Sequence, residues 1–277
     1  MNAEEIKKIN ALVPVEGKIV KIVQETPDTR TYTISTKDGQ KPFTPKPGQL
    51  GMLSLPPYGE AMFSITAQTE DSFDMAIKSV GTMTNALMEA EVGQEVGIRG
   101  PYGNGFPLEL CQGRDIVFIA GGIGLAPVRS LILECIKNRG DYGKLTVIYG
   151  ARSKEDLVFK EDLFEHWPKV ENMEVYTTID RSQDGWNGHV GFVPAYVEEL
   201  NIAPTVAFVC GPPIMIKFTM ESLSKMGYSE DEVVTTMEMR MKCGIGKCGR
   251  CNIGSCFVCL DGPVFTQRQM NQLPQEY

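Results

Sequence analysis

Histidine is nearly absent from this sequence, and the motifs of hydrolytic enzymes are absent with it. The 277 residues include only His166 and His189. We find no Ser–His–Asp set, no HExxH motif and no conspicuous pair of carboxylates. Nothing therefore indicates a second, hydrolytic chemistry, and we expect both histidines to be surface or core residues rather than metal ligands.

Long apolar runs and excess positive charge are also lacking. No run reaches the roughly 18 apolar residues that cross a bilayer, and the opening MNAEEIKKINALVPVEGK has no apolar signal-peptide core. We therefore expect no membrane insertion and a cytoplasmic location. The formal net charge of −8 argues against a general nucleic-acid binder, because phosphate backbones attract Lys- and Arg-rich surfaces. A single nucleotide held in a local pocket stays compatible with that charge.

Cysteine, by contrast, is plentiful: the chain has eight, and five fall between Met241 and Pro263. In a reducing compartment, clustered cysteines are more typical of metal ligands than of disulfides. Cys243, Cys248 and Cys251 are spaced C-x4-C-x2-C, the opening spacing of plant-type [2Fe–2S] ligation. The interspersed glycines would let such a loop wrap closely around a cluster.

The fourth ligand is open on spacing alone, since both Cys256 and Cys259 follow. A competing zinc interpretation uses Cys248, Cys251, Cys256 and Cys259 as C-x2-C-x4-C-x2-C. Paired CxxC motifs are a zinc signal, but a longer segment normally separates them. The zinc interpretation also leaves Cys243 unused. The sequence therefore favours iron–sulfur ligation.

The pattern of apolar, turn and cysteine residues along the chain predicts two domains and a small additional module, which the length of the chain allows. Residues 13–111 contain short alternating runs separated by Gly/Pro-rich turns, which predict a small closed barrel or sandwich. Residues 112–234 alternate apolar strands with helical patterns, which predict a parallel sheet wrapped by helices. Residues 235–277 are expected to form a module organised by cysteines, and residues 1–12 an N-terminal leader.

Three strand ends in the second predicted domain carry small residues that suit a nucleotide. IAGGIGLAPVRSLI places Gly121, Gly122 and Gly124 between a buried strand and a helix, where a pyrophosphate can approach the backbone. The spacing differs from G-x-G-x-x-G, and a bare strand–helix turn explains it too. YGAR and VCGPPIM end later strands at the same carboxyl edge. Arg152 and Lys154 are either contacts to a ribose phosphate or a solvated charge pair.

A second phosphate signal lies in KSVGTMTNAL of the first predicted domain. Gly81, Thr82 and Thr84 fall between a strand and a helical pattern. The free N–H groups of a helix start, with two hydroxyls, suit a phosphate. An ordinary N-cap has the same composition, so both interpretations stay open.

The order of these signals resembles the ferredoxin-reductase superfamily over nearly the whole chain: a barrel, then GGIGLAP, YGAR, CGPPIM and CGIGKCGRCNIG…VCLDGPVF. The chain looks like the branch with a C-terminal [2Fe–2S] module. GKCGRCNIG and GPYGNGFP are most similar to the gamma (diaphorase) subunits of soluble [NiFe] hydrogenases and sulfhydrogenases. The same branch includes the small subunit of NADH-dependent ferredoxin:NADP oxidoreductase, anaerobic sulfite reductase B and the dihydroorotate dehydrogenase electron-transfer subunit.

This resemblance implies an antiparallel FAD-binding β-barrel, a parallel-sheet α/β domain for NAD(P), and a small iron–sulfur module. Ala61 replaces the arginine of the family's R-x-[YF]-S flavin motif. Without that arginine, more of the binding of the FAD phosphates is expected from Gly81, Thr82 and Thr84. The implied FAD residues are Phe63, Ser64, Ile65, Lys78, Gly81, Thr82 and Thr84. The implied NAD(P) residues are Gly121, Gly122, Gly124, Ala126, Pro127, Gly150, Arg152, Cys210, Gly211 and Pro212. The implied cluster ligands are Cys243, Cys248, Cys251 and Cys259, with Cys256 as a spare thiol.

These parts together predict one function. NAD(P)H gives two electrons as hydride, a cluster accepts one, and a flavin does both. We therefore expect an electron-transfer subunit whose partners are iron–sulfur and catalytic subunits of a larger complex, docked near the C-terminal cluster and most similar to a soluble [NiFe] hydrogenase. The related oxidoreductases named above are alternatives, and a zinc-stabilised nucleotide-binding module is the non-redox alternative. NADH and NADPH both stay open, and no catalytic residue beyond the cofactors is predicted.

Overall fold

The computed structural model describes residues 11–274, which form two compact units. The first unit contains the described residues up to Phe106 together with Met237–Val264. The second contains Pro107–Thr236 together with the described residues from Phe265 onward. Each unit thus joins segments that are far apart in the sequence. The predicted leader, residues 1–12, lies almost entirely outside the described residues.

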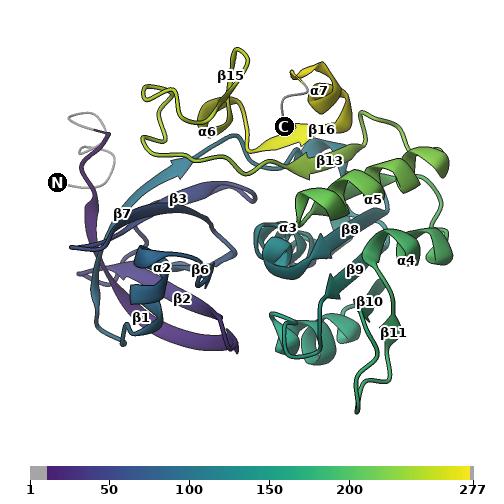
Figure 1. The fold of residues 1–277 in the computed structure, drawn as a ribbon, viewed down its shortest axis with the longest axis horizontal. Helices are drawn as coiled ribbons and strands as arrows, with labels where there is room; N and C mark the ends of the chain where they lie inside the picture. The colour runs from purple at the N-terminus through teal and green to yellow at the C-terminus, as the bar shows by residue number, and fades with distance from the viewer. Residues whose placement is uncertain (1–10, 275–277) are drawn as a thin grey trace. The chain divides into compact units, whose positions relative to one another are not determined.

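A seven-stranded antiparallel sheet forms the first unit, in the order β4-β3-β7-β1-β2-β6-β5 (Figure 1). Its strands are β1 (Val15–Thr26), β2 (Thr29–Thr36), β3 (Leu50–Leu55), β4 (Gly59–Ser64), β5 (Ala67–Gln68), β6 (Phe73–Lys78) and β7 (Glu95–Tyr102). The register pairs Ile19 with Ile34 and Tyr32 with Met75. All four side chains are fully buried, so the alternation seen in the sequence builds one apolar core.

The prediction of a closed barrel is wrong. Among the described residues, no ladder of hydrogen bonds joins the edge strands β4 and β5. Strand β5 has only two residues, and both pair with β6, so it is too short to close the sheet against β4. The helix α2 (Thr82–Met88) packs on the core instead, where the Tyr32 hydroxyl donates to the carbonyl of Leu87 at 2.6 Å.

The second unit contains the predicted parallel sheet, in the order β11-β10-β9-β8-β12-β13-β16. Its strands are β8 (Ile116–Gly121), β9 (Leu145–Ala151), β10 (Met173–Ile179), β11 (His189–Val190), β12 (Val206–Cys210), β13 (Val233–Thr236) and β16 (Val264–Thr266). The ladders from β11 to β13 are parallel. Strands β8, β9 and β12 are buried along their whole length, as expected for a sheet covered on both faces.

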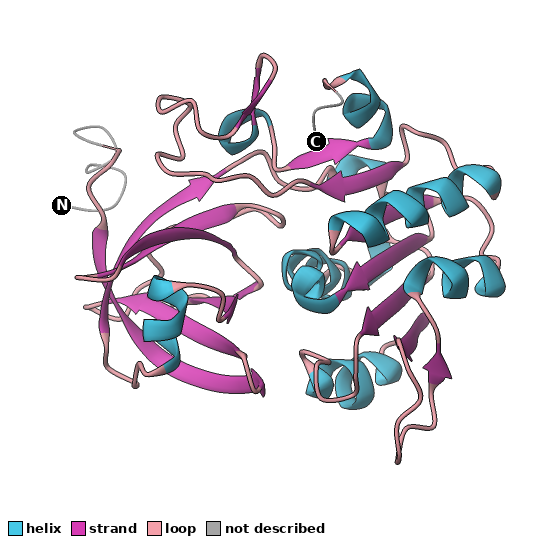
Figure 2. Ribbon diagram, in the orientation of Figure 1, coloured by secondary structure: helices cyan, strands magenta, loops and turns pink. Residues whose placement is uncertain are grey.

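Helices cover both faces of this second sheet (Figure 2). Val193 of α4 (Val193–Leu200) and Leu223 of α5 (Pro213–Lys225) pack with Val117 and Ile119 of β8. The helix α3 (Leu125–Lys137) lies against the opposite face. Strand β8 has β9 on one side and β12 on the other, so the strand order reverses at β8. Open α/β sheets bind ligands at such a point.

The remaining elements are short. They are the 3-10 helices Leu108–Leu110, Gly122–Gly124, Arg139–Asp141 and Trp167–Lys169, a short π-helix at Asp162–His166, the hairpin strands β14 (Asn252–Ile253) and β15 (Cys256–Phe257), α6 (Val258–Asp261) and α7 (Gln267–Gln272). No helix in residues 11–274 combines the length and apolar character needed to span a membrane. The His189 ring stacks on Tyr196, and the His166 side chain is exposed beside Asp162.

Candidate functional site

The structure arranges four of the five clustered cysteines as two pairs. The Cys248 thiol is one of the groups that lower the pKa of Cys243, and the Cys251 thiol is one of those that raise the pKa of Cys259, so the members of each pair are neighbours. Cys256 belongs to neither pair, although the charge of Cys251 is one cause that raises its pKa, after burial and Asp261. Within residues 11–274, no group of three or more His, Cys, Asp or Glu side chains is placed to hold a single metal ion. Four thiols in two pairs fit a binuclear iron cluster, which takes two thiolates on each iron.

Backbone N–H groups of the same loop point at the sulfurs. Lys247 donates to the Cys243 sulfur at 3.3 Å, and Gly246 donates to the Cys259 sulfur at 3.3 Å. Burial alone would raise the pKa of Cys243, but the backbone donors around it lower that pKa to about 7. Gly244 adopts φ of +76°, which only glycine tolerates readily, and the loop curls back over the thiols. The arrangement can hold negative charge on sulfur.

For Cys259 the balance is the reverse. Burial is the largest cause that raises the pKa of this thiol to about 12, and the neighbouring Cys251 thiol adds to the effect. The thiols differ in exposure as well: Cys251 and Cys259 are buried, whereas Cys248 is exposed. One pair therefore lies inside the unit and the other reaches its surface.

The end of β7 and the residues just after it anchor this loop to the sheet of the first unit. The Asn104 side chain donates to the carbonyls of Asp261 at 3.1 Å and Val264 at 2.8 Å, and accepts from the Val264 N–H at 3.2 Å. The Asn104 N–H donates to Gly262 at 2.7 Å. The Tyr102 ring, in the same segment, lies where a Cβ on Gly244 would come within 2.8 Å of it.

Sequence reasoning missed these anchors. Arg99, Tyr102 and Asn104 were not predicted as site residues, yet each contacts the cysteine loop or its immediate continuation. The only signal was GPYGNGFP, which we noted for its family resemblance without assigning it a role.

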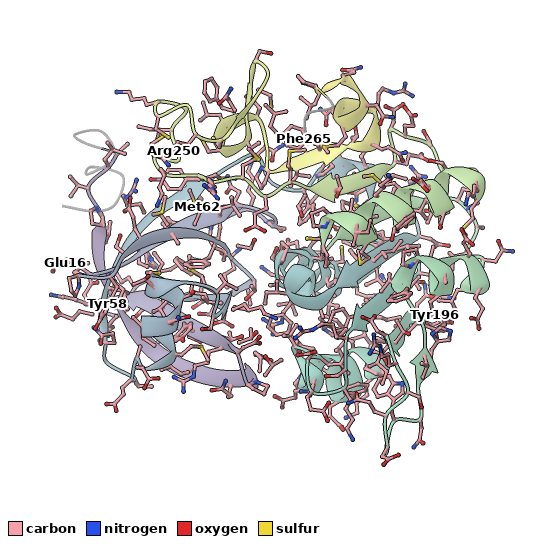
Figure 3. The ribbon with its side chains drawn as sticks, viewed as in Figure 1. Glu16, Tyr58, Met62, Tyr196, Arg250 and Phe265 are labelled. Atoms are coloured by element: carbon pink, nitrogen blue, oxygen red, sulfur yellow. The ribbon has the colours of Figure 1, made fainter. Side chains whose placement is uncertain are left out.

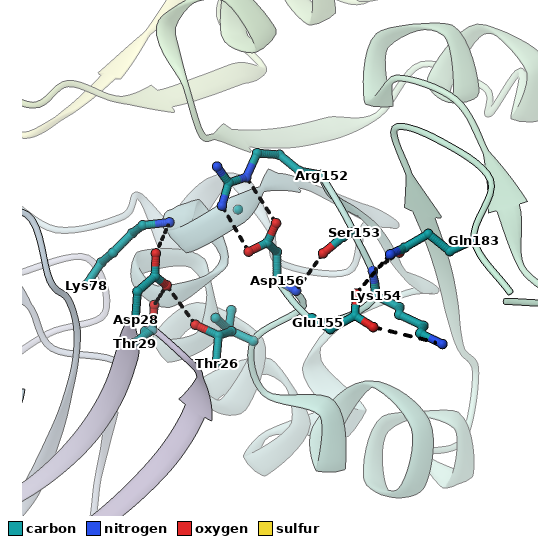
Figure 4. Close-up of polar contacts among 12 residues, drawn as sticks. Thr26, Asp28, Thr29, Lys78, Arg152, Ser153, Lys154, Glu155, Asp156 and Gln183 are labelled. Atoms are coloured by element: carbon teal, nitrogen blue, oxygen red, sulfur yellow. Dashed lines mark hydrogen bonds and ion pairs between the residues drawn. The ribbon is translucent and has the colours of Figure 1, made fainter. Parts of the chain in front are cut away.

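The predicted flavin residues lie on β4, β6 and the segments that follow these two strands of the first unit. Phe63 and Ser64 end β4, followed by the buried Ile65, and Lys78 ends β6. Lys78 forms an ion pair with Asp28 at 3.1 Å (Figure 4). Partial burial by itself would raise the pKa of the Asp28 carboxyl, but hydrogen bonds from Thr26 and Lys78 outweigh it and lower that pKa.

At the start of α2, the hydroxyl of Thr84 is used by the chain itself. It accepts from the N–H groups of Val80 and Gly81 at 2.9 Å each, and donates to the Gly81 carbonyl at 3.0 Å. Thr84, the third residue of α2, therefore bonds back to Gly81, which is the N-cap residue, and this is the kind of local role that the alternative interpretation anticipated. Gly81 and Thr82 are exposed, and a Cβ on Gly81 would meet nothing within 4 Å.

The predicted nucleotide glycines meet the loop after β12. A Cβ on Gly124 would stand 2.5 Å from the Cys210 carbonyl oxygen and 2.6 Å from the Gly211 Cα. Two of the three predicted strand ends are thus in direct backbone contact at the switch point. Gly122 has φ of +54° with open space beside it, and its carbonyl accepts from the buried Tyr149 hydroxyl at 3.0 Å.

Other predicted nucleotide residues have packing roles or local partners. Ala126 is buried in the first turn of α3, and a Cβ on Gly150 would collide with the Val193 side chain of α4. Arg152 is 71% exposed and makes two 3.0 Å contacts with the carboxylate of Asp156 (Figure 4). Lys154 donates to the carbonyl of Asp184 at 2.6 Å. Pro212 precedes α5, and the Cys210 sulfur lies 2.8 Å from the Thr236 hydroxyl.

Three family models match consecutive parts of the chain. An oxidoreductase FAD-binding domain matches residues 16–106, an oxidoreductase NAD-binding domain matches 118–221, and the iron–sulfur cluster binding domain of dihydroorotate dehydrogenase B matches 238–271. The last match contains all five clustered cysteines.

Curated relatives match nearly end to end. The sulfhydrogenase 1 gamma subunit of Pyrococcus furiosus is 36% identical over 261 residues, covering 90% of this chain and 89% of the relative. A probable dihydroorotate dehydrogenase B (NAD(+)) electron transfer subunit of Methanocaldococcus jannaschii is 37% identical over 257 residues, covering 91% and 89%. A solved NADH-dependent reduced ferredoxin–NADP oxidoreductase shares the fold, with a TM-score of 0.75 at 23% identity over 93% of this chain and 89% of that one.

Proposed function

Because the chain belongs to the family of sulfhydrogenase gamma subunits and dihydroorotate dehydrogenase B electron-transfer subunits, we propose that it is the electron-transfer (diaphorase) subunit of a multi-subunit oxidoreductase. It carries electrons between NAD(P)H, FAD and a [2Fe–2S] cluster. The observation that carries this proposal is the arrangement of four cysteines in two pairs, with backbone N–H groups directed at their sulfurs.

We assign the flavin to residues 13–111, the nicotinamide nucleotide to 112–234 and the cluster to 235–277. The flavin, when bound, exchanges hydride with NAD(P)H and single electrons with iron, which neither of the other two groups does. The chain supplies binding and electrostatics. The glycine turn after β8 leaves backbone open beside Gly122 for a nucleotide, and the loop N–H groups of Gly246 and Lys247 support charge on the cysteine sulfurs.

The charge around the cysteine loop of the first unit also supports a partner subunit with an acidic surface. Cys248 is exposed, Lys247 and Arg250 flank it on the same loop, and Lys242 is close by in sequence. Figure 3 labels Arg250 on this loop. Met237–Val264 carries four Lys/Arg and two Asp/Glu, a net +2, in a chain of net −8. We propose that electrons leave beside Cys248 towards a partner subunit with an acidic surface there, in a hydrogenase-type complex.

The sulfhydrogenase likeness favours a hydrogenase-type partner, and the family model over residues 238–271 favours dihydroorotate dehydrogenase as the second candidate. Co-purification of the native complex separates the two, because the partner subunit differs. Clustered thiols suit a reducing compartment, so we propose a cytoplasmic location.

Anaerobic reconstitution of the purified chain tests the redox function. We expect one FAD, with two iron and two acid-labile sulfide ions per chain, and dye reduction driven by NADH or NADPH. Cys248→Ser is the matched variant: it should retain FAD and lose the cluster. One zinc with neither iron nor sulfide would refute the proposal, as would a chain without flavin absorbance.

A charge-reversal series tests the partner surface. Electron transfer to an acidic [2Fe–2S] ferredoxin, used as the probe, should slow by about tenfold in Lys247→Glu/Arg250→Glu and lose its dependence on salt. Lys21→Glu on β1 is the control, and reduction of a neutral dye should be unchanged in every variant. A double variant that keeps the wild-type rate and salt dependence would contradict the acidic partner.

A further inference from the structure

A buried guanidinium lies against the cysteine loop in the first unit. Arg99 of β7 has a side chain only 3% exposed. One terminal nitrogen donates to the Tyr102 hydroxyl at 3.1 Å and to the carbonyl oxygen of Cys243 at 3.2 Å. The other donates to the Glu60 carboxylate at 2.9 Å. The charge of Arg99 is thus attached to the backbone of the first predicted cluster ligand.

The surroundings of the Arg99 side chain are mainly apolar apart from its few polar partners. A pocket of about 350 Å³ adjoins it, and the mainly apolar lining includes Val15, Phe43 and Ile98 together with Ile245 and Cys259 of the cysteine loop. The Arg99 Nε is buried and has no hydrogen-bond partner among residues 11–274.

The carboxylate of Glu60 is the ion-pair partner of Arg99, and its position matters. Glu60 lies on β4 with its side chain 38% exposed, and also accepts from the Ser54 hydroxyl at 3.3 Å. Water therefore screens the carboxylate more than it screens the guanidinium, because screening grows with exposure. The pair presents a net positive field to the loop.

We propose that the Arg99–Glu60 pair sets the reduction potential of the [2Fe–2S] cluster, with Arg99 raising it and Glu60 lowering it. The inference rests on the proposed function, since it requires the cluster. Reduction adds one negative charge to the cluster, and a nearby buried cation stabilises that charge more strongly than an exposed cation at the same distance would. Arg99 is a positioning and tuning residue, because its contact is with the backbone of Cys243 and not with a reacting atom.

An EPR-monitored redox titration of the anaerobically reconstituted full-length protein tests this. Arg99→Gln should lower the equilibrium constant for cluster reduction by about tenfold, which is about 59 mV for one electron. Glu60→Gln retains a hydrogen-bond acceptor for Arg99 and removes only the negative charge, so it should raise the potential. Opposite shifts from the two halves of one ion pair are not expected from a structural role.

Two further variants sharpen the result. Arg99→Lys keeps the charge and should stay within about threefold of wild type in the same equilibrium constant. Lys37→Gln removes an exposed cation at the end of β2, which is paired with Glu16 and Glu95, and should change the constant by less than twofold. An equal effect from Lys37→Gln would overturn the proposal, because it would show a general charge effect.

The outcomes separate this inference from the function beneath it. If Arg99→Gln does not fold or bind a cluster, Glu60→Gln decides: a potential at or below wild type overturns the proposal. Clusters present in all variants with unshifted potentials overturn the inference and leave the proposed function intact. A wild-type chain that binds no iron and sulfide overturns both.

Discussion

Asn104 should control how firmly the cysteine loop is attached to the sheet of the first unit. Its side chain makes three hydrogen bonds to Asp261 and Val264, of 2.8 to 3.2 Å. Asn104→Ala removes all three and leaves the backbone bond to Gly262. Each such bond is worth about 0.5–1.5 kcal/mol net, and Asn104 is exposed enough for water to replace part of the loss. We expect detachment to become easier by roughly 2 kcal/mol, about a thirty-fold larger detached population.

The assay is the loss of visible iron–sulfur absorbance in excess chelator. When detachment and return are fast relative to chelation, the rate follows the detached population, so Asn104→Ala should bleach about thirty-fold faster than wild type. Asn104→Asp keeps the acceptor for the Val264 N–H and loses both donations. Its rate of bleaching should therefore fall between those of wild type and Asn104→Ala. FAD content should not change, because the variant leaves the core of the sheet intact.

The matched control is Asn252→Ala. Asn252 is exposed on β14 of the same loop and makes a single 3.5 Å contact with the Gly254 carbonyl. It should bleach at the wild-type rate. If Asn104→Ala bleached no faster than Asn252→Ala, the anchoring role of Asn104 would be wrong.

Three other predictions follow from the same structure. Cys259→Ser should lose or cripple the cluster while Cys256→Ser keeps its iron and sulfide content, and the reverse result would reassign the fourth ligand. Gly124→Ala should lower the free energy of unfolding by about 1–3 kcal/mol or more, because its Cβ would overlap the backbone of the loop after β12; Gly140→Ala, with open space, should be near neutral in a urea melt. In the metal-free protein, iodoacetamide should alkylate Cys243 with a midpoint near pH 7, because its lowered pKa makes the thiolate dominant above that pH. Cys259, with its pKa raised to about 12, should stay largely unreacted below pH 9. A Cys243 midpoint above pH 8.5 would contradict the role of the loop N–H groups.

The nucleotide glycines show how one sequence pattern can carry two physical causes. Gly121 to Gly124 were predicted because small residues let a pyrophosphate approach. The structure shows that Gly124 is also required by the chain itself, since the Cys210 carbonyl occupies the space of its Cβ. Gly122 has a positive φ that favours glycine, and open space lies where its side chain would be, so its backbone is accessible to a ligand. Gly124→Ala consequently tests folding, whereas nucleotide binding is better tested through the neighbourhood of Gly122.

The sequence by itself determined the features that depend on short spacings. Period-two alternation predicted the antiparallel sheet of the first unit, strand–helix alternation predicted the parallel sheet of the second, and C-x4-C-x2-C predicted iron–sulfur ligation within nine residues. Each of these patterns reports on neighbours a few positions apart, where chain geometry leaves few alternatives. The choice between Cys256 and Cys259 stayed open on spacing and needed the family pattern.

Only the tertiary structure decided the features that depend on distant segments. The open edge between β4 and β5 follows from a strand of two residues, which no alternation pattern resolves. Arg99 meets the carbonyl of Cys243 across 144 positions, and Asn104 meets Val264 across 160. Contacts at such separations leave no periodicity in the sequence, because the two partners are brought together by the packing of the sheet and not by the local path of the chain.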